Sequence, residues 1–115
     1  MSLFTLIRST MNEYRILVVD DEEDLCEILK FNLENEGYEV DTANSAEEAL
    51  KMDISTYDLL LLDVMMGEIS GFKMASMLKK EKKTAKVPII FITAKDNKNS
   101  QKNGKIWINK VSVWY

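Results

Sequence analysis

The sequence predicts an α/β fold in which a doubly wound parallel sheet carries helices on both faces. Short runs of β-branched residues and leucine recur along the chain, and segments with helical spacing separate them. The runs at 15–19, 59–62 and 89–92 are almost wholly apolar, which is typical of strands buried on both faces. With 115 residues, 46% of them hydrophobic and 30% charged, the chain is expected to form one domain.

The first half of the chain alternates strand and helix twice. After the strand at 15–19, residues 22–36 repeat leucine and isoleucine at helical spacing, and Gly37 follows where a left-handed stop is expected. Residues 38–43 alternate as a second strand. Ser45 with Glu48 three residues later predicts a capping box at the start of a short helix.

The second half repeats the alternation and then departs from it. Asp63 ends the strand at 59–62, and a helix is expected after Gly71, with the lysine-rich stretch 79–86 as its solvated end. Pro88 opens the strand at 89–92.

The last part of the chain breaks the pattern. Residues 95–105 hold no apolar side chain, so no amphipathic helix is expected to cover the sheet there. Residues 106–115 are rich in β-branched and aromatic side chains and predict a fifth strand, with no helix after it.

Composition excludes several classes of function. A net charge of −4 argues against direct binding of nucleic acid by this chain. A single cysteine, Cys26, and the absence of histidine exclude an internal disulfide, the usual zinc frameworks and histidine-based triads, and they fit a reducing cytoplasm. Residues 1–13 are interpreted as a leader without the features of a secretory signal, and no apolar run is long enough to span a membrane.

Acidic residues follow two of the predicted strands. Asp20 and Asp21 close the first strand and Asp63 closes the third, so a strand order of 2-1-3-4-5 would bring the three carboxylates together. Such a cluster of hard oxygen ligands suits Mg²⁺ or Mn²⁺. It suggests an aspartate nucleophile that takes a phosphoryl group, with Thr93 at the end of the fourth strand as a hydrogen-bond partner of the phosphoryl oxygens.

Three segments resemble the receiver domain of two-component response regulators: ILVVDDE at 16–22, LLLLDVMM at 59–66 followed by Gly71, and VPIIFITA at 87–94. Their order and spacing make the resemblance specific. It implies a flavodoxin-like fold with strand order 2-1-3-4-5, and similarity to the transcription regulators that carry a winged-helix output domain.

The resemblance also implies roles for individual residues. Asp63 would accept a phosphoryl group from a partner histidine kinase. Asp21, Asp63, Asp20 through water and the backbone carbonyl of Met65 would hold the metal. Thr93 would be the switch hydroxyl that turns toward the new phosphate.

The C-terminal part departs from the family, because its usual fourth and fifth helices are not recognisable. Lys110 is a candidate for the phosphate-contacting lysine and Trp107 for an aromatic switch residue, both displaced from the family pattern. We interpret the change as a truncated or frame-altered receiver. A missing final helix would leave part of the sheet bare, which predicts a homodimer or a strand-exchanged oligomer.

The sequence is therefore interpreted as a leader at 1–13 and a receiver domain at 14–115 that is atypical after about residue 95. It would be a phosphoacceptor that assists its own phosphorylation and dephosphorylation, and not an enzyme acting on a metabolite. One alternative is a pseudo-receiver that keeps the fold without signalling. The other is a phosphatase similar to the haloacid dehalogenases, although Asp20-Asp21-Glu22-Glu23 lacks their second aspartate at the required place.

Overall fold

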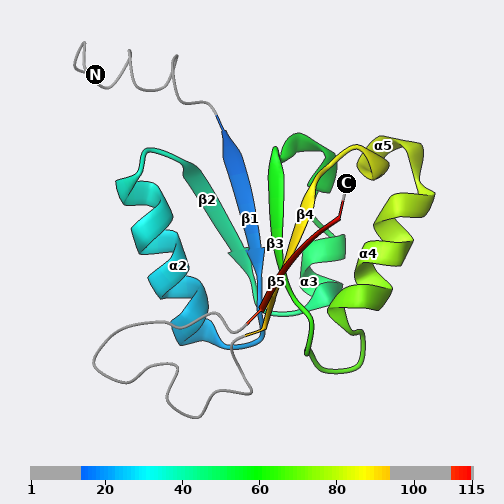
Figure 1. Ribbon diagram of the computed structural model, residues 1–115, viewed down its shortest axis with the longest axis horizontal. Coiled ribbons are helices and arrows are strands. Elements are labelled where there is room, and N and C mark those ends of the chain that lie inside the picture. Colours follow the sequence, from blue (N-terminus) through cyan, green and yellow to red (C-terminus); the bar gives the residue numbers. More distant parts are fainter. Residues whose placement is uncertain (1–13, 94–109, 115) are drawn as a thin grey trace.

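The computed structural model describes residues 14–93 and 110–114 (Figure 1). The predicted leader at 1–13 and Trp107 lie outside the described residues. The strands are β1 (Arg15–Val19), β2 (Glu39–Ala43), β3 (Leu59–Asp63), β4 (Ile89–Thr93) and β5 (Lys110–Trp114). The helices are α2 (Glu23–Asn35), α3 (Ala46–Leu50), the 3₁₀ turn η1 (Ile54–Thr56), α4 (Gly71–Lys80) and α5 (Lys82–Ala85).

The sheet has the order β2-β1-β3-β4-β5, which confirms the predicted order. Strands β1 to β4 are parallel, and Val19 at the end of β1 pairs with Ala43 on one side and Leu62 on the other. Parallel strands in register end at the same edge of the sheet. The residues that follow β1, β2 and β3 are therefore neighbours, although they are far apart in the sequence.

The fifth strand corrects the prediction of an all-parallel sheet, because β5 runs antiparallel to β4 and pairs Lys110 with Thr93 (Figure 1). A parallel neighbour would require a crossover of a dozen or more residues that packs on a face of the sheet, commonly as a helix. Residues 95–105 have no apolar side chain to bury in such a crossover. Antiparallel pairing requires only that the chain reverse its direction.

Helices lie on both sides of the sheet, with α2 on one face and α3, α4 and α5 on the other (Figure 1). The larger core cluster fills the space between the sheet and the second group of helices. Five of its largest side chains are completely buried: Leu17, Leu60, Leu62, Met74 and Ile89. A smaller cluster under α2 contains Ile16, Val18, Cys26 and Val40. The apolar runs of β1 and β3 thus face both clusters, which is why they lack polar alternation.

Serine side chains start two of the helices. The Ser45 hydroxyl accepts the N–H of Glu48 at 2.9 Å, and a Glu48 carboxylate oxygen accepts the N–H of Asn44 at 3.2 Å. This confirms the capping box, with Glu48 reaching back to the residue before Ser45. Ser70, which the sequence analysis missed, caps α4 by accepting the N–H of Lys73 at 3.2 Å.

We expect Ser45→Ala to lower the free energy of unfolding by about 1 kcal/mol, because the first turn of α3 would lose its side-chain acceptor. Urea unfolding followed by circular dichroism measures the change. Ser76→Ala is the matched control, since Ser76 is an exposed residue inside α4, where alanine is tolerated well. A loss of equal size in both variants would contradict the capping role.

The lysine stretch is more than the solvated helix end that was predicted. The Lys79 ammonium donates hydrogen bonds of 2.9 Å to the carbonyls of Ala85 and Val87, and its burial lowers the pKa of Lys79. The Thr84 hydroxyl donates to the Leu78 carbonyl at 2.6 Å. Carbonyls left without helical partners at the end of α4 and around α5 need such donors. Lys79 and Thr84 thus hold the corner that leads into β4.

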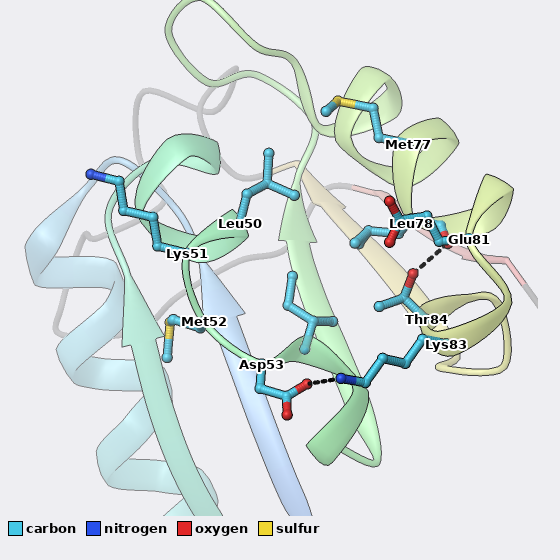
Figure 2. A pocket seen from close by; sticks show the side chains of 10 residues that line it. Leu50, Lys51, Met52, Asp53, Met77, Leu78, Glu81, Lys83 and Thr84 are labelled. Carbon is cyan, nitrogen blue, oxygen red and sulfur yellow. Dashed lines mark hydrogen bonds and ion pairs between the residues drawn. The ribbon is translucent and has the colours of Figure 1, made fainter.

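This corner borders an open cleft of about 410 Å³ between α3, η1, α4 and α5 (Figure 2). Met52 and Met77 contribute apolar surface to its lining, and Lys83 and Asp53 form an ion pair of 3.8 Å across one side. Both partners of the pair are mostly exposed, so it adds little to stability. Since η1 precedes β3 and α5 precedes β4, the cleft lies toward the edge where these strands begin.

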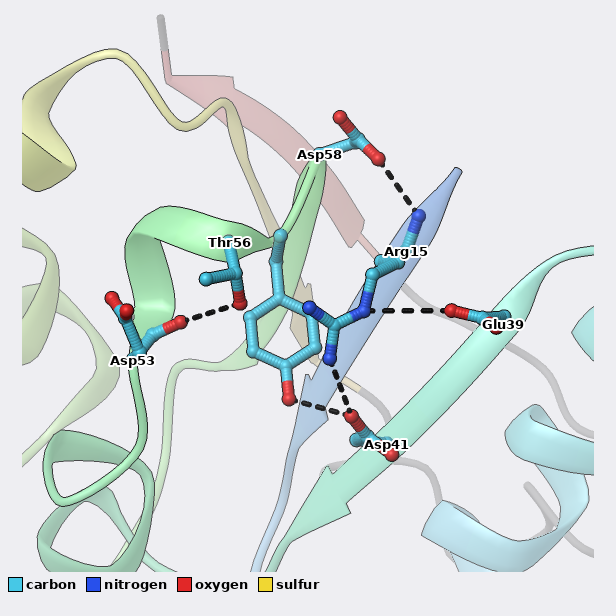
Figure 3. A network of polar contacts seen from close by, with 7 residues as sticks. Arg15, Glu39, Asp41, Asp53, Thr56 and Asp58 are labelled. Carbon is cyan, nitrogen blue, oxygen red and sulfur yellow. Dashed lines mark hydrogen bonds and ion pairs between the residues drawn. The ribbon is translucent and has the colours of Figure 1, made fainter. Parts of the chain in front are cut away.

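A second polar network ties together the starts of β1 and β3 and the middle of β2 (Figure 3). The Arg15 guanidinium lies 4.5 Å from the centre of the Tyr57 ring and 3.4 Å from an Asp41 oxygen. The Tyr57 hydroxyl donates to the same Asp41 oxygen at 2.6 Å, and burial together with this bond raises the pKa of Tyr57 to about 12. The network supports the sheet at the edge opposite the acidic residues.

Candidate functional site

Three carboxylates meet at the edge of the sheet where β1 and β3 end. Asp20 and Asp21 directly follow β1, Asp63 is the last residue of β3, and the two strands are neighbours. One carboxylate oxygen from each residue lies within 4.8 Å of the others. The structure therefore brings together the three acidic side chains as the sequence predicted.

Burial makes this cluster electrostatically costly. Asp20 and Asp63 are each 1% exposed, whereas Asp21 is exposed to solvent. Two like charges about 4 Å apart repel by about 4 kcal/mol at an effective dielectric constant of 20. A cation that enters from the exposed side of Asp21 would remove this repulsion.

The Asp63 side chain is oriented by the loop that follows it. The backbone N–H of Met65 donates to Asp63 Oδ1 at 3.1 Å. The loop is anchored in turn, because Val64 donates its N–H to the carbonyl of Ile92 at 3.2 Å and accepts the N–H of Gly71 at 3.0 Å. Strand β4 and the start of α4 thus hold the carboxylate in place. The Met65 side chain, by contrast, is 53% exposed.

The Asp20 side chain is oriented by the start of α2. Its Oδ1 atom accepts the backbone N–H of Glu22 at 2.9 Å. Glu22 precedes the first residue of α2, and its own side chain makes no capping hydrogen bond. An acceptor that satisfies a free N–H at a helix start is a usual role for aspartate. In this chain the same carboxylate belongs to the acidic cluster.

The residues present fit a hard divalent cation. All the side-chain donors in the cluster are carboxylate oxygens, and the chain contains no histidine. Mg²⁺ and Mn²⁺ prefer such oxygen ligands, and Mg²⁺ keeps several waters when one or two carboxylates bind it. The exposed position of Asp21 leaves room for those waters.

The backbones of Thr93 and Lys110 reach the same edge of the sheet. Asp63 pairs with Ile92 across β3 and β4, so Thr93 lies one residue beyond the partner of Asp63. Lys110 pairs with Thr93 because β5 is antiparallel and begins where β4 ends. In a parallel fifth strand, the residue at this edge would be the one that follows the strand. In the antiparallel β5 it is Lys110, the first residue of the strand.

Cys26 lies beneath the acidic cluster, on α2. Its side chain is 2% exposed, which confirms the small buried role expected from the sequence, and its Sγ donates to the carbonyl of Asp20 at 3.3 Å. Burial, with a further contribution from the Asp20 charge, raises the pKa of the Cys26 thiol to about 12. The thiolate, which is the reactive form, is therefore scarce at neutral pH.

We expect Cys26 to react with a thiol reagent at pH 8 at least about a hundredfold more slowly in the folded protein than in urea, because both its burial and its raised pKa suppress the thiolate. The absorbance change with a chromogenic disulfide reagent measures the rates. Equal rates in the folded and unfolded protein would contradict the burial of this side chain.

Asn44 is a site residue that the sequence analysis missed. It directly follows β2, and its side-chain Nδ2 donates to the carbonyl of Asp20 at 3.2 Å. The signal that could have found it is the strand order, because β2 ends beside β1 and its next residue must lie near Asp20.

In the part of the chain that the structure describes, no helix is long and apolar enough to cross a membrane.

Comparison with known proteins gives consistent matches. The pattern of the response regulator receiver domain matches residues 16–106. The chain is 45% identical over 83 residues to the alkaline phosphatase synthesis transcriptional regulatory protein PhoP of Bacillus subtilis, which covers 71% of this chain and 34% of PhoP. It thus spans about a third of the length of such curated relatives.

Solved structures agree. The response regulator TrrA of Thermotoga maritima in complex with Mg²⁺ and BeF aligns with a TM-score of 0.65 and 45% identity, over 78% of this chain and 76% of TrrA. TrrA in a crystal structure with the histidine kinase ThkA aligns with a TM-score of 0.64 and 50% identity, over 70% of this chain and 69% of that one. Because the family pattern covers most of the fold and the acidic cluster lies where the strands end, this chain belongs to the family of response regulator receiver domains.

Proposed function

We propose that this receiver domain accepts a phosphoryl group on Asp63 from a histidine kinase. The observation that carries the proposal is the buried Asp63 carboxylate. It accepts the N–H of Met65, and one of its oxygens lies within 4.8 Å of one oxygen of Asp20 and one of Asp21. Family membership supports the same reaction, since receivers are signalling domains. The family resemblance assigns the nucleophile to Asp63, and the loop that follows this residue is anchored on both sides.

The reaction requires one bond to form and one to break. An Asp63 carboxylate oxygen forms a bond to phosphorus while the bond between phosphorus and the histidine nitrogen of the donor breaks, and the nitrogen leaves with the electron pair. The product is an acyl phosphate on Asp63. The Met65 N–H holds the nucleophile in its orientation before the donor arrives, which reduces the entropic part of the barrier.

Asp20, Asp21 and Asp63, with the backbone carbonyl of Met65, would hold Mg²⁺ or Mn²⁺ in this reaction. The bound ion would offset the charge of the carboxylates and of the phosphoryl oxygens. The TrrA structure with Mg²⁺ and BeF supports this assignment. In the same proposal Thr93 is the hydroxyl that responds to the phosphate, and Lys110, whose backbone pairs with that of Thr93, is the candidate phosphate contact.

The biological context of the proposal is two-component regulation of transcription. PhoP is a transcriptional regulatory protein about three times as long as the matched segment. In this proposal the receiver forms the N-terminal part of a longer transcription regulator that acts in the cytoplasm. TrrA in complex with ThkA supports a histidine kinase as the partner. DNA binding would then belong to a separate output domain.

Intact mass spectrometry tests the phosphoacceptor. The protein is incubated with acetyl phosphate and Mg²⁺, and we expect one phosphoryl adduct that is lost in Asp63→Asn and after chelation of the metal. Asp58→Asn is the matched control, since Asp58 is an exposed carboxylate at the opposite edge that also accepts a backbone N–H. An adduct that persists in Asp63→Asn would contradict the proposal.

The alternatives predict different results, one in the same assay and one in a turnover assay. A pseudo-receiver would fold and bind Mg²⁺ without forming the adduct. A phosphatase similar to the haloacid dehalogenases would turn over a generic phosphate ester such as p-nitrophenyl phosphate, with many products released per protein molecule. We expect no such turnover, because the only aspartates beside Asp63 in the described cluster are Asp20 and Asp21, which the proposal uses as metal ligands.

A further inference from the structure

The main chain of Asp20 is held on both of its polar groups. Its N–H donates to the carbonyl of Ala43 at 3.1 Å. Its carbonyl accepts two donors, Asn44 Nδ2 at 3.2 Å and Cys26 Sγ at 3.3 Å. The two donors are also 3.6 Å apart, so they form one small cluster beneath the acidic site.

The backbone carbonyl of Asp20 lies between two of the proposed metal ligands. It belongs to the peptide unit that joins Asp20 to Asp21, so its orientation limits the directions that both carboxylates can take. The donors reach it from different elements, because Cys26 lies on α2 and Asn44 lies between β2 and α3. Loss of either contact would leave the carbonyl with one side-chain donor and would loosen the peptide unit that joins two proposed metal ligands.

The hydrogen-bond chemistry fixes which end of Asn44 faces the site. A backbone carbonyl can only accept, so the amide nitrogen of Asn44, and not its oxygen, must point toward Asp20. The backbone N–H of Asn44 is used separately, by the Glu48 carboxylate that caps α3. The side chain of Asn44 therefore serves the cluster beneath the acidic site, through Asp20 and Cys26, while its main-chain N–H belongs to the helix cap.

We propose that Asn44 is a positioning residue for the divalent-cation site, assisted by Cys26, and that it acts by fixing the peptide unit between Asp20 and Asp21. The inference rests on the proposed metal site. Neither residue touches the metal: they orient its ligands, as outer partners do in other metal sites. Preorganised ligands bind a cation more tightly because less entropy is lost when it enters.

Calorimetric titration with MgCl₂ at constant ionic strength tests the proposal without any phosphoryl donor. We expect Asn44→Ala to raise the Kd for Mg²⁺ about five- to tenfold, and Cys26→Ala to raise it less. Cys26→Ser keeps a donor and should stay near the wild-type value. Cys26→Ala also serves as the second variant if Asn44→Ala does not fold, which circular dichroism shows directly.

Ser45→Ala is the matched control, because it weakens the start of α3 beside Asn44 without touching Asp20. We expect it to lose stability while its Kd for Mg²⁺ stays within about twofold of wild type. Equal weakening in Ser45→Ala and Asn44→Ala would assign the effect to general instability and overturn the proposal. So would an unchanged Kd in Asn44→Ala.

The outcomes also separate this inference from the proposed function. If the wild type binds Mg²⁺ and Asp63→Asn does not, while Asn44→Ala binds like wild type, the metal site stands and the positioning role is wrong. A wild type that binds no Mg²⁺ overturns the metal site and the positioning role together.

Discussion

Gly71→Ala is expected to destabilise the protein by about 3 kcal/mol, because the start of α4 leaves no space for a side chain. A Cβ atom on Gly71 would overlap the carbonyl oxygen of Asp63 and would lie 2.9 Å from its carbonyl carbon and 3.0 Å from the Cα of Val64. These are backbone atoms of β3 and its loop, which cannot turn aside as a flexible side chain can. The helix propensity of alanine, which favours it over glycine by about 1 kcal/mol, is smaller than this effect.

Urea unfolding measures the loss, and Gly67→Ala is the control. Gly67 lies in the same loop between β3 and α4, and a Cβ there meets no atom within 4 Å. We expect Gly67→Ala to leave stability nearly unchanged. Gly71→Ala should also weaken Mg²⁺ binding, because the displaced backbone carries Asp63. If Gly71→Ala is as stable as the wild type, the backbone of α4 does not pack against the end of β3 as closely as the structure shows.

Asp63→Asn is expected to stabilise the protein by about 2 kcal/mol in the absence of divalent cations. The substitution removes one charge from three that lie within 4.8 Å, and each close pair repels by up to about 4 kcal/mol at an effective dielectric constant of 20. The amide oxygen of asparagine can still accept the N–H of Met65, so the loop keeps its anchor.

Mg²⁺ should reverse this ranking, because a ligand that binds only the folded state stabilises it by an amount that grows with the ligand concentration relative to Kd. Thermal unfolding at several MgCl₂ concentrations gives both results. We expect the wild type to gain stability steadily and Asp63→Asn to gain little. Asp58→Asn removes a charge at the opposite edge and should behave like wild type. If Asp63→Asn and Asp58→Asn stabilise the protein by the same amount without Mg²⁺, the effect comes from the net charge of the protein and not from repulsion within the acidic cluster.

Much of the fold was predictable because its signals are local. The buried strands carry nearly uninterrupted apolar runs, and the capping box at Ser45 and the glycine at position 37, which has a φ of 98°, depend only on neighbouring residues. Helix α2 was expected at 22–36 and is found at Glu23–Asn35. The position of the acidic site could be predicted once the strand order was assumed, because that order makes β1 and β3 neighbours.

What escaped prediction depends on contacts between distant segments. The polar stretch 95–105 argued against a covering helix, but the antiparallel direction of β5 is seen only in its pairing with β4. The sequence does not distinguish Lys79 from the other lysines of this stretch. Only the folded structure places its ammonium beside the carbonyls of Ala85, at the end of α5, and of Val87, which follows α5.

The residues of the site divide in the same way. Asp20, Asp21 and Asp63 could be named from the amino-acid order alone, because an acid after a buried strand in a parallel sheet must lie at the carboxyl edge. Asn44 and Cys26 could not be named in this way. Their role depends on hydrogen bonds of 3.2 and 3.3 Å to the backbone carbonyl of Asp20, which follows the neighbouring strand β1. Hydrophobic periodicity specifies which elements form and which faces they bury, whereas the orientation of a single peptide unit depends on donors that only packing brings within reach.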